Sequence, residues 1–519
     1  MTKEQDKQRS TSLSALVVMV ATLFSRMLGF VKVALISHLF GATGKADVFN
    51  FVFDIPNNLR KLMAEGALSS AFIPTLSQSI ADKNGSDKRL VRTLLTFQFL
   101  ILIPLCVLAV IFKREVILFL SEYEDPDRIE LAASLFQFFI HYILFVSISA
   151  VIMATLNSRR HFLTPALAPI VFSVCVIISV LAFHKKWDIF SMALGVLSGG
   201  VAQILIQLPV FYKKGYRMTP DFHFRDPYFR TILRRWVPVL FASCIFFVNQ
   251  LIANKFASGL DDGSVSALKN SIIFWQLPQG IFGASLSTVL FPKMSREAVE
   301  NDTEGLRRSV NYGLTFLYIL LIPSSLILIL FGPQMVAVTL QHGKFTLTDS
   351  ILTARVLSYY SFGLFFSAGF TFLQRFFYSR QKFFVPVAVS IVLVLIDIGC
   401  SLWLKETALR VSGLALANSV SFAVAFFIQL YLVKRELHHI GFMGFLKEAG
   451  KGTLAMIPFT AYLVAVGFLS YWKEGFSLMN FATAALVGIG AVLILFFSFY
   501  LFKIEILTDI LKRRRKSRD

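Results

Sequence analysis

Charged residues are scarce in this chain. Asp, Glu, Lys and Arg together make up 16% of the 519 residues, whereas an ordinary soluble domain contains about 25%. The sequence has no Walker motif, no GxGxxG segment after a strand pattern, no HExxH and no GxSxG. These absences argue against a soluble enzyme and against an ATP-driven pump.

Cysteines are also few, and each of them lies within an apolar stretch: Cys106, Cys175, Cys244 and Cys400. None shows the CxxC spacing that is typical of metal sites and redox centres. We therefore interpret the cysteines as packing residues, and we expect neither a metal nor a cofactor.

Apolar residues, in contrast, are abundant and form long runs. They make up 56% of the chain. Runs such as 94–112, 384–404 and 481–502 match the roughly 20 residues that a helix needs to cross a bilayer. Runs of this kind divide the sequence into about fourteen spans. The pattern predicts an all-α integral membrane protein.

The excess of positive charge follows a membrane topology. The formal net charge is +20, and Lys and Arg are concentrated at the two ends and in the even-numbered connections between spans. By the positive-inside rule, both termini are predicted to lie in the cytoplasm. Because topology and anionic headgroups account for these basic clusters, we expect contact with membrane lipids and none with nucleic acid.

A short internal repeat indicates how the spans are grouped. Residues 67–77 (ALSSAFIPTLS) align without gaps on residues 285–295 (SLSTVLFPKMS). The copies end the second and the eighth span, so two halves of six helices are expected to share one orientation. The predicted organisation is a first lobe over 1–212, a cytoplasmic linker at 213–235, a second lobe over 236–434, two additional helices over 435–503 and a basic cytoplasmic tail at 504–519.

Polar side chains gather in the first two spans. The candidate binding residues there are Arg26, Lys32, Asp47, Asn57, Arg60, Lys61 and Glu65. Charges inside a membrane are costly and usually serve a function. Pro56 is predicted to break the second span, which is tolerated where the backbone lines a wet cavity. We interpret the cluster as a cationic cavity suited to phosphate. A purely structural network of ion pairs is the alternative.

Several segments carry a resemblance to a known family. They are SRMLGF (25–30), FGA (40–42), ADVF (46–49), IPNNLRK (55–61), AEGA (64–67), AFIP (71–74), QLPQGIFG (276–283), GKFT (343–346) and FYSRQ (377–381). Together, and in this order, they resemble the sequence pattern of the MurJ (MviN) lipid II flippases, which belong to the MOP exporter superfamily.

The resemblance implies a fourteen-helix transporter, not an enzyme, in the bacterial cytoplasmic membrane. Family members move the undecaprenyl-diphosphate-linked disaccharide-pentapeptide, lipid II, to the outer leaflet by alternating access during peptidoglycan synthesis. Arg26 and Arg60 match arginines of the family's central cavity, and Asp47, Asn57, Lys61 and Glu65 match its other polar positions. Proteins of cell-wall synthesis are further candidate partners.

Two departures from the family pattern concern charge. Lys32-Val33 stands where the family usually has Arg-Asp, which keeps the positive charge but loses the planar fork and the carboxylate. Ile273 stands where the second lobe usually has an arginine. Lys269, about one turn earlier, is one candidate for the missing charge. The other possibilities are binding mainly by the first lobe, and a divergent paralogue with another substrate.

Asp397 is an acidic residue in the middle of an apolar span, with Ser401 on the same helical face. An intramembrane carboxylate can relay protons or bind a coupling cation, and Asn418 on the next span is a candidate partner. A carboxylate that is hydrogen-bonded to a neighbouring helix, or held protonated, is the alternative.

Two other functions stay open at this stage. A related exporter for another lipid-linked saccharide would share the two-lobe plan. A membrane scaffold for cell-wall enzymes would not transport at all, but it would have no need for Arg26, Arg60 and Glu65 in the membrane.

Overall fold

The computed structural model describes residues 21, 24–60, 67–82, 85–439 and 441–505. Over these ranges the chain forms helices and contains no strand, which confirms the predicted all-α fold. Nine of the described helices are long and apolar enough to cross a membrane, or ten if two helices bent by 43° form one span. The number of about fourteen spans stays a prediction.

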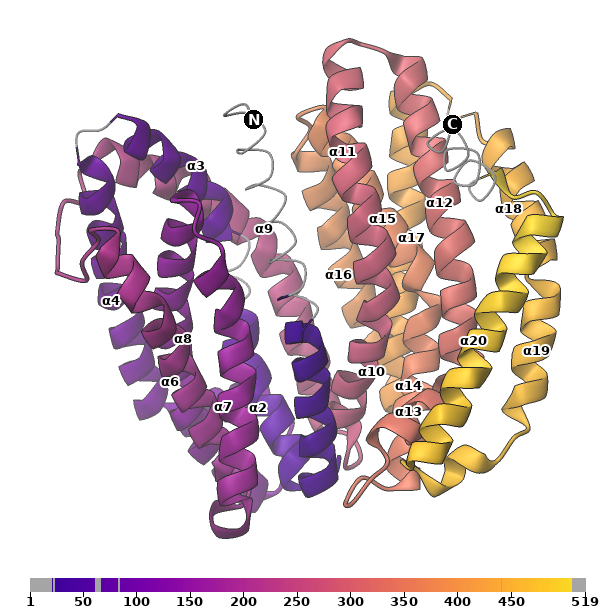
Figure 1. Cartoon of the computed structure of the whole chain (residues 1–519), viewed down its shortest axis with the longest axis horizontal. Coiled ribbons are helices and arrows are strands. Elements are labelled where there is room, and N and C mark those ends of the chain that lie inside the picture. The colour runs from indigo at the N-terminus through magenta and orange to yellow at the C-terminus, as the bar shows by residue number, and fades with distance from the viewer. Residues whose placement is uncertain (1–20, 22–23, 61–66, 83–84, 440, 506–519) are drawn as a thin grey trace, which may run out of the picture. The chain divides into compact units, whose positions relative to one another are not determined.

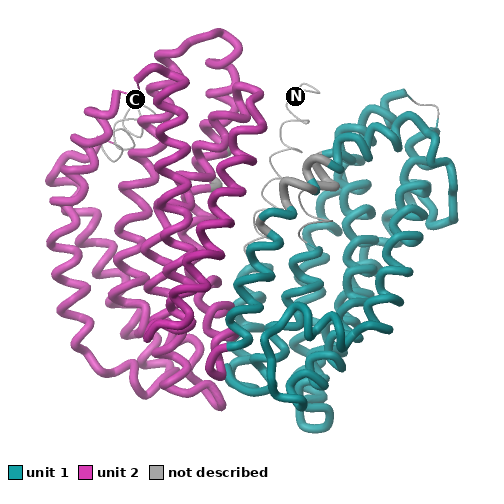
Figure 2. Tube along the Cα trace, turned by 180° about the vertical axis from the view of Figure 1, so that it is seen from behind, with its two compact units in different colours: residues 1–259 teal, residues 260–519 magenta. Residues whose placement is uncertain are grey.

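The chain divides into two compact units, residues 1–259 and 260–519 (Figure 2). The first unit begins with a helix over 24–40. It continues with α2 (Lys45–Arg60), α3 (Ala67–Ala81), α4 (Ser86–Ile111), α5 (Lys113–Leu120), α6 (Pro126–Ser158), α7 (Leu163–Trp187), α8 (Phe190–Lys213) and α9 (Pro227–Ser258).

The second unit is also helical. Its elements are α10 (Ser264–Pro278), the π-helical turn η2 (Gln279–Gly283), α11 (Ala284–Val299), α12 (Thr303–Leu330), α13 (Gly332–Leu340), α14 (Leu347–Phe362), α15 (Leu364–Ser379), α16 (Phe384–Leu404), α17 (Val411–Glu436), α18 (Met443–Ala455), α19 (Ile457–Gly467), the 3₁₀ turn η3 (Tyr471–Glu474) and α20 (Leu478–Leu501).

The internal repeat has a counterpart in the helix bounds. When residue 67 is aligned on residue 285, α2 falls on residues 263–278, and the observed α10 is Ser264–Pro278. In the second unit η2 joins α10 to α11, whereas residues 61–66, between α2 and α3, lie outside the described residues. The matching starts of α2 and α10 support the two-halves hypothesis, and the lobe boundaries stay a prediction.

Pro56 does not break its helix where the sequence predicts a break. It lies inside α2, which continues to Arg60. A proline removes one backbone hydrogen bond, and α2 nevertheless continues past it.

Helix α6 forms the centre of the first unit, whereas α4 lies at its edge (Figure 1). In the most apolar window of α6, 72% is buried inside the protein, against 33% for α4. Because both helices are apolar, the low burial of α4 indicates that one of its sides faces lipid.

Close packing of α7 on α8 depends on glycines. A Cβ added to Gly199 would lie 2.8 Å from the Phe172 ring, and one added to Gly195 would lie 2.8 Å from the Val176 backbone. Small residues let the two helices approach at these points, as in many membrane proteins. The packing fixes the Phe172 ring, which lies next to a candidate site residue described below.

The start of α9 packs into the first unit, although the sequence places the end of the linker at residue 235. Phe229 and Ile232 are buried in a cluster with Phe72 of α3 and Leu90 of α4. Tyr216, in the connection between α8 and α9, is fully buried in the same cluster. Apolar burial therefore holds both this connection and the first turns of α9 against α3 and α4.

In the second unit, the two last long helices cover α12 and α13. Phe459 and Leu463 of α19 and Ala491 of α20 are buried in a cluster with Phe331 and Val338. A second cluster joins α12, α18 and α20. The additional helices that the sequence predicts after residue 435 therefore pack as part of this unit.

Candidate functional site

The candidate cations of the first span lie on one helix, over residues 24–40. Arg26 is exposed on this helix, and Lys32 is half-buried. The Lys32 ammonium lies 5.2 Å from the centre of the Phe172 ring of α7. A cation–π contact of this kind orients the ammonium over the face of the ring.

Helix α2 holds the buried acids of the region. Asp47 is 4% exposed and lies in the first turn of α2, where its negative charge stabilises the amino-terminal end of the helix. Asp54 is also buried, and Asn254 of α9 donates a hydrogen bond to it at 3.2 Å. These two acids have structural partners within the first unit.

The structure brings two of the predicted site residues into contact at the end of α2. The Nε of Arg60 donates a hydrogen bond to the Oδ1 of Asn57 at 3.3 Å. Asn57 therefore orients Arg60, while Lys61 and Glu65 lie outside the described residues.

In the second unit, Ile273 stands at the position where an arginine is expected. Ile273 and Lys269 are both half-buried on α10. Residues four apart share one face of a helix, so Lys269 presents its ammonium about one turn from the Ile273 position. This spacing keeps Lys269 a candidate for the missing charge.

Asp397 of α16 and Asn418 of α17 are in contact, as their positions on adjacent spans suggested. The Nδ2 of Asn418 donates a hydrogen bond to the Oδ2 of Asp397 at 3.1 Å. Asp397 and Ser401 are both buried, with 5% and 4% of their surfaces exposed. The geometry fits both interpretations of Asp397, a coupling site and a carboxylate held by a neighbouring helix.

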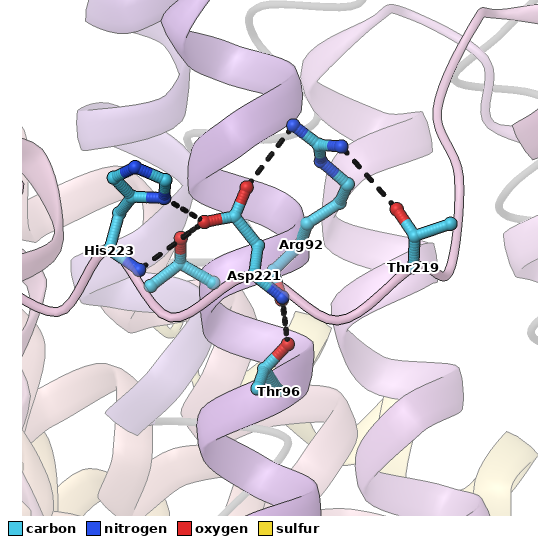
Figure 3. A network of polar contacts seen from close by, with 6 residues as sticks. Arg92, Thr96, Thr219, Asp221 and His223 are labelled. Carbon is cyan, nitrogen blue, oxygen red and sulfur yellow. Dashed lines mark hydrogen bonds and ion pairs between the residues drawn. The ribbon is translucent and has the colours of Figure 1, made fainter.

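Sequence reasoning missed a polar network that holds the connection between α8 and α9 (Figure 3). Asp221 of this connection is buried and forms an ion pair with Arg92 of α4 at 3.1 Å. His223 and Thr93 also donate hydrogen bonds to its carboxylate, and Thr96 accepts one from its backbone N–H. Burial alone would raise the pKa of Asp221, but the bonds from His223 and Thr93 outweigh burial and hold it below its usual value.

A second network fixes the same connection closer to α8. Arg159, which caps α6, donates to Asp87 of α4 at 2.5 Å and to the Tyr216 hydroxyl at 2.8 Å. Tyr216 donates in turn to Asp87 at 2.8 Å. Burial, together with the hydrogen bond to Asp87, raises the pKa of Tyr216, so the hydroxyl stays protonated. The sequence signal for these networks is weak. Acids are mixed with the basic residues at 213–235, but the positive-inside rule already accounts for those basic residues.

Comparison with known families and proteins gives a consistent result. A sequence model described as "Lipid II flippase MurJ" matches residues 36–486. A probable lipid II flippase MurJ of Borreliella burgdorferi is 33% identical over 505 residues, which cover 96% of this chain and 98% of that protein. The lipid II flippase MurJ of Burkholderia cenocepacia is 31% identical over 380 residues, with 71% and 73% covered.

Solved structures support the same fold. A lipid II flippase MurJ in an inward closed conformation superposes with a TM-score of 0.79 at 24% identity, over 96% of this chain and 100% of that chain. An inward-facing multidrug resistance MATE family transporter of the MOP superfamily gives a TM-score of 0.64 at 14% identity, over 83% and 99%. At these identities the similarity concerns the fold alone.

Proposed function

Because the chain belongs to the lipid II flippase MurJ family, a family of transporters and not of enzymes, we propose that it moves lipid II across the bacterial cytoplasmic membrane. The substrate would be the undecaprenyl-diphosphate-linked disaccharide-pentapeptide, carried from the cytoplasmic to the outer leaflet. The match of the family over residues 36–486 is the observation that carries this proposal.

The proposed orientation places both termini in the cytoplasm. It is supported by the concentration of Lys and Arg at the ends and in the even-numbered connections of the sequence. In this orientation the connection between α8 and α9 and the start of α4 lie on the cytoplasmic side, where anionic lipids are concentrated.

The diphosphate of the substrate is held, in this proposal, by the polar residues of the first unit. They are Arg26, Lys32, Asp47, Asn57, Arg60, Lys61 and Glu65. Arg60 supports the assignment because Asn57 orients its guanidinium through Nε, and a guanidinium can bind phosphate oxygens with planar, bidentate geometry. Lys32 contributes charge without bidentate geometry. Ile273 adds no charge from α10, so the first unit supplies most of the binding.

Alternating access requires an energy source, and Asp397 is the proposed coupling residue. Its carboxylate is buried in α16 and accepts a hydrogen bond from Asn418 of α17. Together with Ser401 it offers oxygen ligands to a proton or a small cation. Two helices of the second unit would then respond to ion binding.

Complementation tests the transport proposal. In a cell depleted of its own lipid II flippase, the wild-type chain is expected to restore growth, and Arg26→Ala and Arg60→Ala are expected to fail at equal membrane levels. Arg114→Ala is a matched control, because Arg114 is also exposed but lies on α5. Growth with both site variants would rule out an essential cationic site.

A divergent exporter for another lipid-linked saccharide is the second candidate, and the specific observation in its favour is Ile273 on α10. Under this alternative the wild-type chain reaches the membrane but does not complement. A membrane scaffold for cell-wall synthesis proteins would not transport lipid II, so it would also fail to complement, and Arg26→Ala and Arg60→Ala would not change its association with those proteins.

A further inference from the structure

A pocket of about 370 Å³ lies away from the candidate substrate residues, between α4 and the connection that follows α8. One wall is a stripe of α4 that includes Phe99, Leu100 and Ile103. The other wall is formed by the connection, with Met218, Pro220 and Phe222. The lining is therefore almost entirely apolar, and we refer to it as the α4 groove.

The α4 groove follows the helix axis. Its helical residues run from Leu95 to Pro104 at intervals of about four, which places them on one face of α4. Nine residues of an α-helix cover about 14 Å. An apolar groove that extends this far along a helix suits an acyl chain better than a polar headgroup.

The groove opens toward lipid and not toward water. Leu100 and Ile103 in its wall are 52% and 47% exposed, and their neighbours Val107 and Leu108 are 52% and 53% exposed. Such a run of large exposed apolar side chains on a membrane-spanning helix faces hydrocarbon. A lipid can therefore enter the groove from the bilayer.

Positive charge surrounds one end of the groove. Arg92 lies one turn before Leu95 and donates to Thr219 of the groove wall at 3.4 Å. One turn earlier, Lys88 is exposed and its ammonium lies 3.0 Å from the position that a Cβ on Gly215 would occupy. Arg217 is exposed beside Met218. An anionic headgroup would meet these cations while its chain lies in the groove.

The acids near this end are already engaged. Asp221 is paired with Arg92, and Asp87 is paired with Arg159. Lys88, Arg89 and Arg217 therefore give the rim of the groove a positive charge. A headgroup whose only charge is its phosphate fits this rim better than a zwitterionic headgroup, whose additional positive charge would be repelled.

We propose that the α4 groove binds one anionic phospholipid of the cytoplasmic leaflet, with an acyl chain along α4 and the headgroup phosphate at Lys88 and Arg217. The lipid would contact both α4 and the connection that links α8 to α9. Its binding would stabilise the position of this connection. The proposal rests on the proposed orientation but not on lipid II transport.

Native mass spectrometry of the delipidated full chain tests the proposal. We would add dioleoylphosphatidylglycerol, dioleoylphosphatidylcholine or undecaprenyl phosphate separately and measure the affinity for the first bound lipid. Phosphatidylglycerol is expected to bind about tenfold more tightly than phosphatidylcholine. Equal affinity for these two phospholipids would overturn the proposal, and so would a clear preference for undecaprenyl phosphate, which would indicate a polyprenyl site.

Two pairs of variants locate the bound lipid. Leu100→Trp fills the groove and is expected to weaken phosphatidylglycerol binding about fivefold. Its control is Ile101→Trp, which is expected to have no effect. Ile101 is 43% exposed on the same helix but lies outside the groove lining. Lys88→Gln with Arg217→Gln should abolish the headgroup preference, and Lys185→Gln with Lys186→Gln, exposed at the end of α7, should preserve it. Equal effects within either pair would contradict the proposed site.

Two controls distinguish a loss of lipid binding from a loss of the fold and from an inverted orientation in the membrane. Each variant must show the wild-type midpoint of thermal unfolding in lipid-free detergent, so that a loss of binding reflects the groove and not the fold. Labelling of Lys214→Cys in cells by a membrane-impermeant thiol reagent would reveal an inverted orientation. Inversion would overturn the assignment to the cytoplasmic leaflet, whatever the outcome for lipid II transport.

Discussion

Two regions of the first unit use charged side chains in different ways. Where the connection after α8 packs on α4, two buried carboxylates have a cationic partner: Asp221 of the connection pairs with Arg92, and Asp87 of α4 pairs with Arg159. Near the candidate substrate site, Asn57 accepts a hydrogen bond from Arg60, and Lys32 lies over the Phe172 ring. Ion pairs between elements stabilise a fold, whereas contacts that orient a cation can position it for an anionic ligand.

The largest expected effect is on transport, at Arg60. Arg60→Ala removes the guanidinium that the account assigns to the diphosphate, and transport should fall by about a hundredfold, because a charged hydrogen-bonded contact is lost. The unfolding midpoint should stay within about 1 °C of wild type. Vesicle translocation assays and thermal unfolding measure the two quantities. A large loss of stability would mean that Arg60 belongs with the structural charges.

The next effect is on stability, at Arg159. Arg159→Ala leaves Asp87 without its cation and should lower the free energy of unfolding by about 2 kcal/mol; this is less than for a fully buried pair, because Arg159 is 31% exposed. Transport per folded molecule should change little. Denaturant unfolding of the purified variant measures the loss. If Arg159→Ala matched wild-type stability but abolished transport, Arg159 would belong with the charges that serve transport and not with those that stabilise the fold.

Asp397 is expected to show a selective effect on coupling. Asp397→Asn preserves the size of the side chain and its contact distance to Asn418, but it removes the negative charge. The dependence of transport on the driving ion or on the proton gradient should disappear, while lipid II binding persists. Initial rates measured over a range of ion concentrations provide the test. An unchanged ion dependence would support a purely structural carboxylate.

The smallest effect is the pH dependence of the Asp221 network. Because bonds within the folded protein hold the pKa of Asp221 below its usual value, its ionised form stabilises the fold above the unfolded pKa of about 3.9. The stabilisation is lost as the pH falls through the lower folded pKa. The stability difference between wild type and Asp221→Asn should be present at about pH 5 and shrink as the pH falls below about 4. A difference that grows on acidification would contradict the assignment.

The helical membrane architecture could be predicted from the sequence, because the hydropathy of a segment depends only on its own residues. Apolar runs predicted a helical membrane protein, and the segments around Arg26, Asn57 and Arg60 indicated the family that the comparisons confirm. The contact of Asp397 with Asn418 was also foreseen, since adjacent spans pack together and an intramembrane carboxylate needs a polar partner.

Other features depended on tertiary structure and could not be foreseen. Asp54 and Asn254 are 200 residues apart, and no local pattern joins them. The Asp221 network forms because the connection after α8 folds back on α4, which a charge count cannot show. Pro56 was expected to break the second span, but the helix absorbs the proline and ends at Arg60.

The central claim is that cations of the first unit hold the diphosphate of lipid II. Binding of lipid II to the purified chain, compared between wild type, Arg60→Ala and Arg114→Ala at equal stability, tests it most directly. The account predicts that Arg60→Ala weakens binding by about tenfold or more, while Arg114→Ala binds like wild type. Equal affinity of all three proteins would contradict it.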